Sequence, residues 1–139
     1  NIEEFLQRKT HGNNAFAAGD YKCAHEHYSA ALKIDPKHTL MKIQLYFNMA
    51  QASWNLRNYT RAIDEYTKVI QINSIHLNAL KQRGKCYLAI DKFEKATADF
   101  IRVKNLNPTD PDCLALMSEA EAKQSELKNG FSEKNRVGE

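Results

Sequence analysis

The side chains most able to do chemistry here are five histidines, three cysteines and scattered carboxylates. His25 and His27 are two residues apart, so on a helix they would face different ways. The other histidines, His11, His38 and His76, lack nearby acidic or thiol partners, and we expect no metal site. The sequence also has no Gly-rich phosphate-binding pattern. Neither the hydrolase motif G-x-S-x-G nor the zinc-binding motif H-E-x-x-H occurs in it. We therefore predict neither an enzymatic activity nor a cofactor.

Composition favours one compact, soluble, helical domain. The chain has 139 residues, 27% charged and 42% hydrophobic, with only 5 Gly and 3 Pro, which excludes collagen-like and disordered classes. Cys23, Cys86 and Cys113 are widely spaced and odd in number, as expected of free thiols in the cytoplasm, with the nucleus as a second location. No apolar stretch nears the ~20 residues that span a bilayer. A net charge of only +3 argues against nucleic acid as a partner.

The elements that must position any site are repeated. Three stretches share one order: an aromatic residue, alanine three later, an aromatic four after that and a small apolar residue three after that. Their anchor alanines are Ala24, Ala62 and Ala96. This 3-and-4 spacing marks one face of a helix. The stretches end alike, in Ile34-Asp35-Pro36, Ile72-Asn73-Ser74 and Leu106-Asn107-Pro108, where a helix would stop.

A residue without bulk stands twelve positions before each anchor alanine: Gly12, Ala50 and Gly84. Its small size would let a first helix approach the second closely. The sequence thus predicts three helical hairpins, with helices near 2–18 and 21–34, 38–56 and 59–72, and 75–89 and 93–106.

A seventh helix is predicted from about 110 to 128. Asp110 and Pro111 are typical of a helix start, and such a helix would cap the last hairpin. Dimerisation through Leu114, Leu116 and Met117 on this helix stays open. We expect 129–139 to be a polar tail or linker.

Hairpins of about 34 residues with these small, aromatic and alanine positions resemble the tetratricopeptide repeat. The repeats span about 5–38, 43–76 and 77–110, so 1–128 would form one domain. The resemblance implies an all-α, right-handed superhelical solenoid of three hairpins plus a C-terminal capping helix. Four additional residues, Thr39 to Lys42, precede the second repeat and would lengthen its first helix by about one turn.

One subclass of this family, the dicarboxylate-clamp domains of heat-shock co-chaperones, grips the C-terminal Glu-Glu-Val-Asp of Hsp70 and Hsp90 chaperones. Lys9, Asn13 and Asn48 match three positions of its carboxylate-binding pattern. Asn78 and Gln82 stand where that pattern has Lys and Arg, and glutamine supplies no charge for a carboxylate.

Two further lysines could replace the missing donors. Lys81 and Lys85 lie four residues apart, close to the unmatched positions, and could point into the family's concave groove. Arg83 falls where a residue normally packs within the hairpin. Phe16 and Phe47 could contact apolar residues of a peptide, although core packing competes with that role.

The resemblance implies a non-catalytic module that binds an acidic C-terminal chaperone peptide. With the pattern incomplete, we expect weak binding, in about the micromolar range or weaker. The layout is especially similar to the last repeat cluster of J-domain (Hsp40) co-chaperones. The alternative is a scaffold that binds a non-chaperone protein through the same groove.

Overall fold

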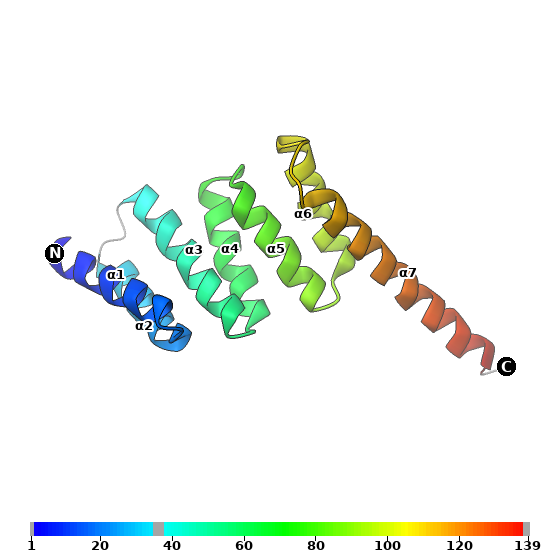
Figure 1. Cartoon of the computed structure of the whole chain (residues 1–139), viewed down its shortest axis with the longest axis horizontal. Coiled ribbons are helices and arrows are strands. Elements are labelled where there is room, and N and C mark those ends of the chain that lie inside the picture. The colour runs from blue at the N-terminus through cyan, green and yellow to red at the C-terminus, as the bar shows by residue number, and fades with distance from the viewer. Residues whose placement is uncertain (1, 35–37, 138–139) are drawn as a thin grey trace. The chain divides into compact units, whose positions relative to one another are not determined.

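Seven helices make up the part of the chain that the computed structural model describes, residues 2–34 and 38–137, with side chains described up to residue 130. Figure 1 shows them in chain order. They are α1 (Ile2–Ala17), α2 (Tyr21–Ile34), α3 (Thr39–Asn55), α4 (Tyr59–Ile72), α5 (Leu77–Ala89), α6 (Phe93–Leu106) and α7 (Cys113–Val137). The first six agree with the predicted ranges within two residues. The predicted helix end at Asp35-Pro36 lies outside the described residues.

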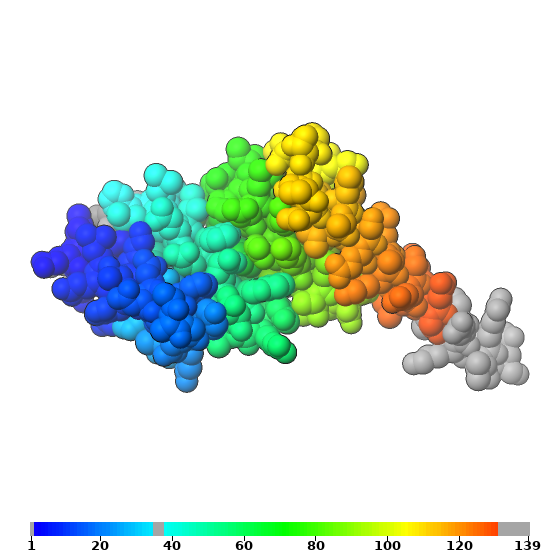
Figure 2. Space-filling view, viewed as in Figure 1, coloured from blue at the N-terminus to red at the C-terminus, as the bar shows by residue number. Residues whose placement is uncertain are grey.

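The chain divides into two compact units, residues 1–79 and 80–139. In the first unit α1 packs on α2, α2 on α3, and α3 on α4. In the second unit α6 packs on α7. Side chains fill the spaces between neighbouring helices of each unit, as the space-filling view shows (Figure 2). No helix within the described ranges combines the length and apolar character needed to cross a bilayer.

Gly12 and Gly84 mark close approaches between paired helices, as predicted. A methyl group added to Gly12 would lie 2.6 Å from Cε1 of the buried Tyr28 ring, and one added to Gly84 would lie 2.5 Å from Cε1 of Phe100. Both separations are far shorter than a carbon–carbon contact. Glycine is therefore required for these aromatic rings to pack directly against the backbone of the preceding helix.

The turns of the three hairpins share one backbone conformation. Gly19, Arg57 and Asp91 each stand five residues before an anchor alanine and have left-handed backbone angles, with φ of 80°, 60° and 62°. In the second hairpin the amide of Asn58 donates to the carbonyl of Ser53 at 2.9 Å, a bond that closes the helix end. Equivalent bonds join Asp20 to Ala15 and Lys92 to Tyr87.

The last helix begins close to the predicted position and ends later than predicted. Asp110 Oδ1 accepts hydrogen bonds from the backbone amides of Asp112 and Cys113, both at 3.0 Å, so it caps α7 as expected. The helix does not end near residue 128 but continues to Val137. Gly130 costs a helix only about 1 kcal/mol, and the sequence has good helix formers before it, Glu126 to Lys128, and after it, Glu133 and Lys134.

Candidate functional site

One cavity in the first unit brings together four of the predicted site residues. Its volume is about 260 Å³. Its lining residues come from α1, α2 and α3, and they are Asn13, Phe16, Ala17, Tyr28, Phe47, Asn48 and Gln51. We call it the α1–α3 cavity. Side-chain amides and aromatic rings therefore share one hollow surface, which suits a ligand with both oxygen atoms and apolar groups.

A buried tyrosine orients the amide of Asn13. The Tyr28 hydroxyl donates to Asn13 Oδ1 at 2.7 Å, and Tyr28 is only 2% exposed. Burial raises the pKa of this hydroxyl, so it stays protonated and can donate. Because the amide oxygen accepts this bond, the two N–H groups of Asn13 are the part that can donate to a ligand.

Lys9 lies on α1 one turn before Asn13. Its Nζ donates to Gln44 Oε1 at 3.0 Å, across from α1 to α3, in an exposed position. Gln44 in turn lies one turn before Asn48 on α3. The acceptor is a neutral amide, so a carboxylate that replaced it would gain a charge-assisted hydrogen bond.

The two phenylalanines line the cavity and also pack against neighbouring rings. Phe47 lies 5.7 Å from Tyr66 and 5.3 Å from His76, between ring centroids. Phe16 lies 5.1 Å from Tyr21, edge to face. Both are half-buried. Ring packing therefore holds each phenylalanine on one side while it lines the cavity, and contact with a peptide stays a prediction.

Gln51 was not among the predicted site residues. It lines the cavity, and its Oε1 accepts a hydrogen bond from the hydroxyl of Tyr66. The repeat alignment carries a signal for it: Gln51 directly follows Ala50 as Asn13 directly follows Gly12. Comparison of the polar residues with the clamp pattern alone does not indicate Gln51.

The predicted residues of α5 are not all available to a ligand. Lys81 Nζ lies 2.6 Å from Asp110 Oδ2 and 3.5 Å from Asp112 Oδ2, so its ammonium is engaged at the connection between α6 and α7. Asn78 is exposed in the first turn of α5. Gln82 and Lys85 are half-buried residues of the second unit.

The ion pair shifts both pKa values. Burial alone would lower the pKa of Lys81, but the hydrogen bond and charge of Asp110 outweigh it and raise that pKa. The hydrogen bond from Lys81 holds the pKa of Asp110 below its ordinary value, against the effect of burial. The pair therefore stabilises the fold fully between about pH 4 and pH 10, and the contribution falls away in stronger acid or base.

Arg83 packs within the third hairpin as predicted. Its Nε donates to Asp99 Oδ2 at 2.8 Å and its second terminal nitrogen to Oδ1 at 2.7 Å. Asp99 is buried, so this two-pronged pair supplies the charge and donors that a buried carboxylate needs. Arg83 is thus a structural residue.

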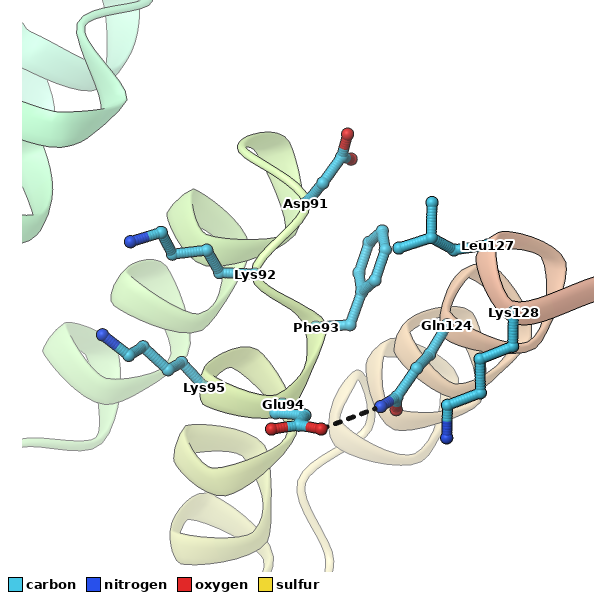
Figure 3. A pocket seen from close by; sticks show the side chains of 8 residues that line it. All are labelled: Asp91, Lys92, Phe93, Glu94, Lys95, Gln124, Leu127 and Lys128. Atoms are coloured by element: carbon cyan, nitrogen blue, oxygen red, sulfur yellow. Dashed lines mark hydrogen bonds between the residues drawn. The ribbon is translucent and has the colours of Figure 1, made fainter. Parts of the chain in front are cut away.

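A cavity in the second unit holds none of the predicted site residues. It measures about 460 Å³ and lies between the first turn of α6 and residues 124–128 of α7. Figure 3 shows Phe93 and Leu127 facing one another across it, with Glu94 Oε1 and Gln124 Nε2 joined at 3.4 Å. Two acidic residues and three lysines are among the residues that line it. This mixed rim favours no particular charge in a ligand.

Comparisons with known proteins place the chain in a family. The tetratricopeptide-repeat model matches residues 43–76, the range predicted for the second repeat. DnaJ homolog subfamily C member 7 of Mus musculus is 32% identical over 78% of this chain and 22% of its own length. The Hsp70/Hsp90 co-chaperone cns1 of Schizosaccharomyces pombe is 32% identical over 94% of this chain and 37% of its own length.

Solved structures agree. The second TPR domain of human RPAP3, solved in complex with the HSP70 peptide SGPTIEEVD, has a TM-score of 0.74 and 25% identity over 86% of this chain and 97% of that domain. The chain spans between about a fifth and two fifths of the length of the two curated relatives. Repeat pattern, paired helices and comparisons together show that this chain belongs to the tetratricopeptide-repeat family.

Proposed function

We propose that the first unit binds the acidic C-terminal end of an Hsp70- or Hsp90-type chaperone at the α1–α3 cavity, as the non-catalytic interaction module of a co-chaperone. The terminal carboxylate takes hydrogen bonds from Lys9, Asn13 and Asn48. Apolar groups of the peptide lie against Phe16 and Phe47. The observation that carries the proposal is that Asn13, Asn48 and both phenylalanines line one cavity.

The donor chemistry supports a carboxylate ligand. The bond from Tyr28 leaves the N–H groups of Asn13 to donate, and Lys9 stands one turn away, bonded only to a neutral amide oxygen of Gln44 in the described structure. A carboxylate can displace that weak acceptor. Hydrogen bonds to charged groups each contribute about 1.5–3 kcal/mol net of the exchange with water.

The comparisons support the choice of partner. The similar RPAP3 domain was solved with an HSP70 peptide that ends in Glu-Glu-Val-Asp, and the cns1 relative is an Hsp70/Hsp90 co-chaperone. The proposal uses residues of the first unit alone. Contributions of Asn78, Gln82 and Lys85 stay predictions, which single alanine variants at those positions test.

The direct test is a titration of SGPTIEEVD into the 139-residue chain, followed by calorimetry or fluorescence anisotropy. We expect saturable binding with Kd in about the micromolar range. Lys9→Ala should weaken it about tenfold, the equivalent of one charge-assisted hydrogen bond. Lys33→Ala is the matched control, because Lys33 is an exposed lysine of α2 that does not line the cavity.

Two outcomes would overturn the proposal. One is the absence of saturable binding by the wild-type chain. The other is an affinity that Lys9→Ala and Lys33→Ala leave equally unchanged.

A second candidate is a scaffold that binds a non-chaperone protein at the same cavity. It is favoured by Asn78 and Gln82, which replace cationic residues of the clamp pattern, and by Lys81, which is paired with Asp110 and Asp112. A pull-down from cell lysate distinguishes the two candidates. Chaperones retained by the wild type and lost with Lys9→Ala support the first, whereas a different protein with the same dependence supports the second.

A further inference from the structure

The two hairpins of the first unit carry the same tyrosine–amide pair. Asn13 and Gln51 each directly follow the small residue of the repeat pattern, Gly12 or Ala50. In each hairpin a tyrosine fifteen residues later donates its hydroxyl to the amide oxygen, Tyr28 to Asn13 and Tyr66 to Gln51. The pairing is therefore a repeated feature of the unit and not a single chance contact.

The tyrosine in each pair determines which end of the amide a ligand can reach. Tyr28 is 2% exposed and Tyr66 is fully buried, so neither ring can turn its hydroxyl out to solvent. Each amide oxygen accepts from a fixed phenol, and the N–H groups are left to donate. Because both amides line the α1–α3 cavity, their N–H groups add hydrogen-bond donors to its wall, and each amide oxygen is already engaged by a tyrosine hydroxyl.

The third hairpin shows that packing alone does not require the pair. There Phe100 occupies the ring position beside Gly84, at nearly the same separation as Tyr28 beside Gly12. Phe100 has no hydroxyl, and Lys85 stands at the position of the amide. A ring without oxygen packs equally well at the close approach. The tyrosine hydroxyls of the first unit are thus not needed for packing. They hydrogen-bond to amides that line a cavity.

We propose that Gln51 is a specificity-determining residue of the α1–α3 cavity, with Tyr66 as its positioning residue. The Nε2 group of Gln51 donates to a side-chain carboxylate of the bound peptide, upstream of the terminal carboxylate that Lys9, Asn13 and Asn48 hold. This inference rests on the proposed function. It adds a preference that the terminal carboxylate cannot supply: one acidic side chain over an aliphatic one.

The test combines variants of the chain with variants of the peptide. SGPTIEEVD and two derivatives, each with one glutamate replaced by leucine, are titrated into the wild type and into Gln51→Met, which keeps the length of the side chain without its donor. We expect the wild type to lose about five- to tenfold in affinity for one leucine peptide. Gln51→Met should bind the parent peptide more weakly than the wild type does, by a similar factor. Its affinity for that leucine peptide should equal its affinity for the parent peptide.

Tyr66→Phe tests the positioning role. The example of Phe100 indicates that the ring will still pack. We expect this variant to discriminate between the peptides as poorly as Gln51→Met, and the double variant to be no worse than either single one. Asn55→Ala is the control, because Asn55 is an exposed amide residue on the same helix and does not line the cavity. Its side chain donates to the backbone carbonyl of Gln51, not to the side-chain amide.

The inference is wrong if Gln51→Met and the wild type discriminate identically among the three peptides. In that case an intact effect of Lys9→Ala would leave the proposed function standing. If the wild type binds none of the peptides, the proposed function is wrong and this inference is wrong with it.

Discussion

The first and third hairpins pack the same ring at the same place and give it different chemistry. In the first hairpin Tyr28 lies against Gly12 and donates to Asn13. In the third, Phe100 lies against Gly84 and has no oxygen to donate. The glycine and the ring are thus demanded by helix packing, whereas the hydroxyl is not. In Tyr28, therefore, the ring carbons serve helix packing and the hydroxyl orients the amide of Asn13.

The second and third hairpins differ in a similar way at a buried carboxylate. Glu65 and Asp99 each stand three residues after an anchor alanine, and both are buried. Arg83 satisfies Asp99 within its own hairpin. Glu65 instead lies 2.5 Å from His25 of α2 and accepts from Ser53 of α3 at 2.5 Å. This second arrangement ties neighbouring hairpins together, so one repeat position can serve either within a hairpin or between two.

The largest expected effect comes from removing the partner of Asp99. Arg83→Met should lower the free energy of unfolding by about 3 kcal/mol, because it leaves a buried carboxylate without its charge partner. His25→Ala should cost less, since Glu65 keeps its bond from Ser53. Urea unfolding followed by circular dichroism measures both. Equal losses in the two variants would contradict the distinction between the hairpins.

The shared packing position comes next. Gly84→Ala should destabilise the chain by about 1–2 kcal/mol, because the new methyl group would collide with the Phe100 ring and overpacking outweighs the gain in helix propensity. Gly130→Ala is the matched control, because the added carbon would meet no described atom within 4 Å apart from its chain neighbours and the nearby backbone of its own helix. Thermal unfolding compares them. A Gly84→Ala variant as stable as the control would show that the close approach is not restrictive.

Making the first hairpin resemble the third should separate stability from binding. Tyr28→Phe removes one hydrogen bond and should cost about 0.5–1.5 kcal/mol of stability. It frees the Asn13 amide to turn, so affinity for SGPTIEEVD should fall severalfold at a temperature where the variant remains folded. Calorimetry measures both quantities on one sample. An unchanged affinity would mean that the hydroxyl has no part in orienting Asn13.

The smallest effect concerns the turn that all three hairpins share. Arg57 and Asp91 adopt the left-handed conformation that Gly19 adopts without strain. Replacing either with glycine relieves about 1 kcal/mol of strain, part of which is lost to the greater freedom of the unfolded chain. We expect a gain of about 0.5 kcal/mol from each, measured as a higher urea midpoint. Gly19→Ala should shift the midpoint the other way.

The repeat pattern predicted most of the fold because each hairpin reuses the same local rules. Helix ends followed from turn residues, and Gly12 and Gly84 indicated the close approaches. The sequence did not reveal that Lys81 is bonded to Asp110, since that pair joins residues 29 apart and leaves no periodic signal. The repeat alignment pairs Gln51 with Asn13, but it does not reveal the hydrogen bond that Gln51 accepts from Tyr66 on another helix.

The end of α7 was missed for a different reason. Asn129 and Gly130 are typical breakers, but single unfavourable residues rarely stop a helix whose neighbours favour it. Propensities differ by only about 1 kcal/mol between most residue types, so one or two unfavourable residues are a weak guide to where a helix ends. In the hairpins, by contrast, the periodic pattern and the turn residues that follow it together indicated where the helices end.

The central claim, that the amides of the α1–α3 cavity donate to a terminal carboxylate, can be tested by following their own N–H groups. Side-chain NH₂ resonances of Asn13 and Asn48 are recorded in ¹H–¹⁵N spectra while SGPTIEEVD is added, and the titration is repeated with the same peptide carrying a C-terminal amide. We predict large, saturable shifts of both pairs with the free acid, and much smaller shifts at much weaker affinity with the amide. Binding that leaves both pairs unmoved, or equal binding of the two peptides, would contradict the account.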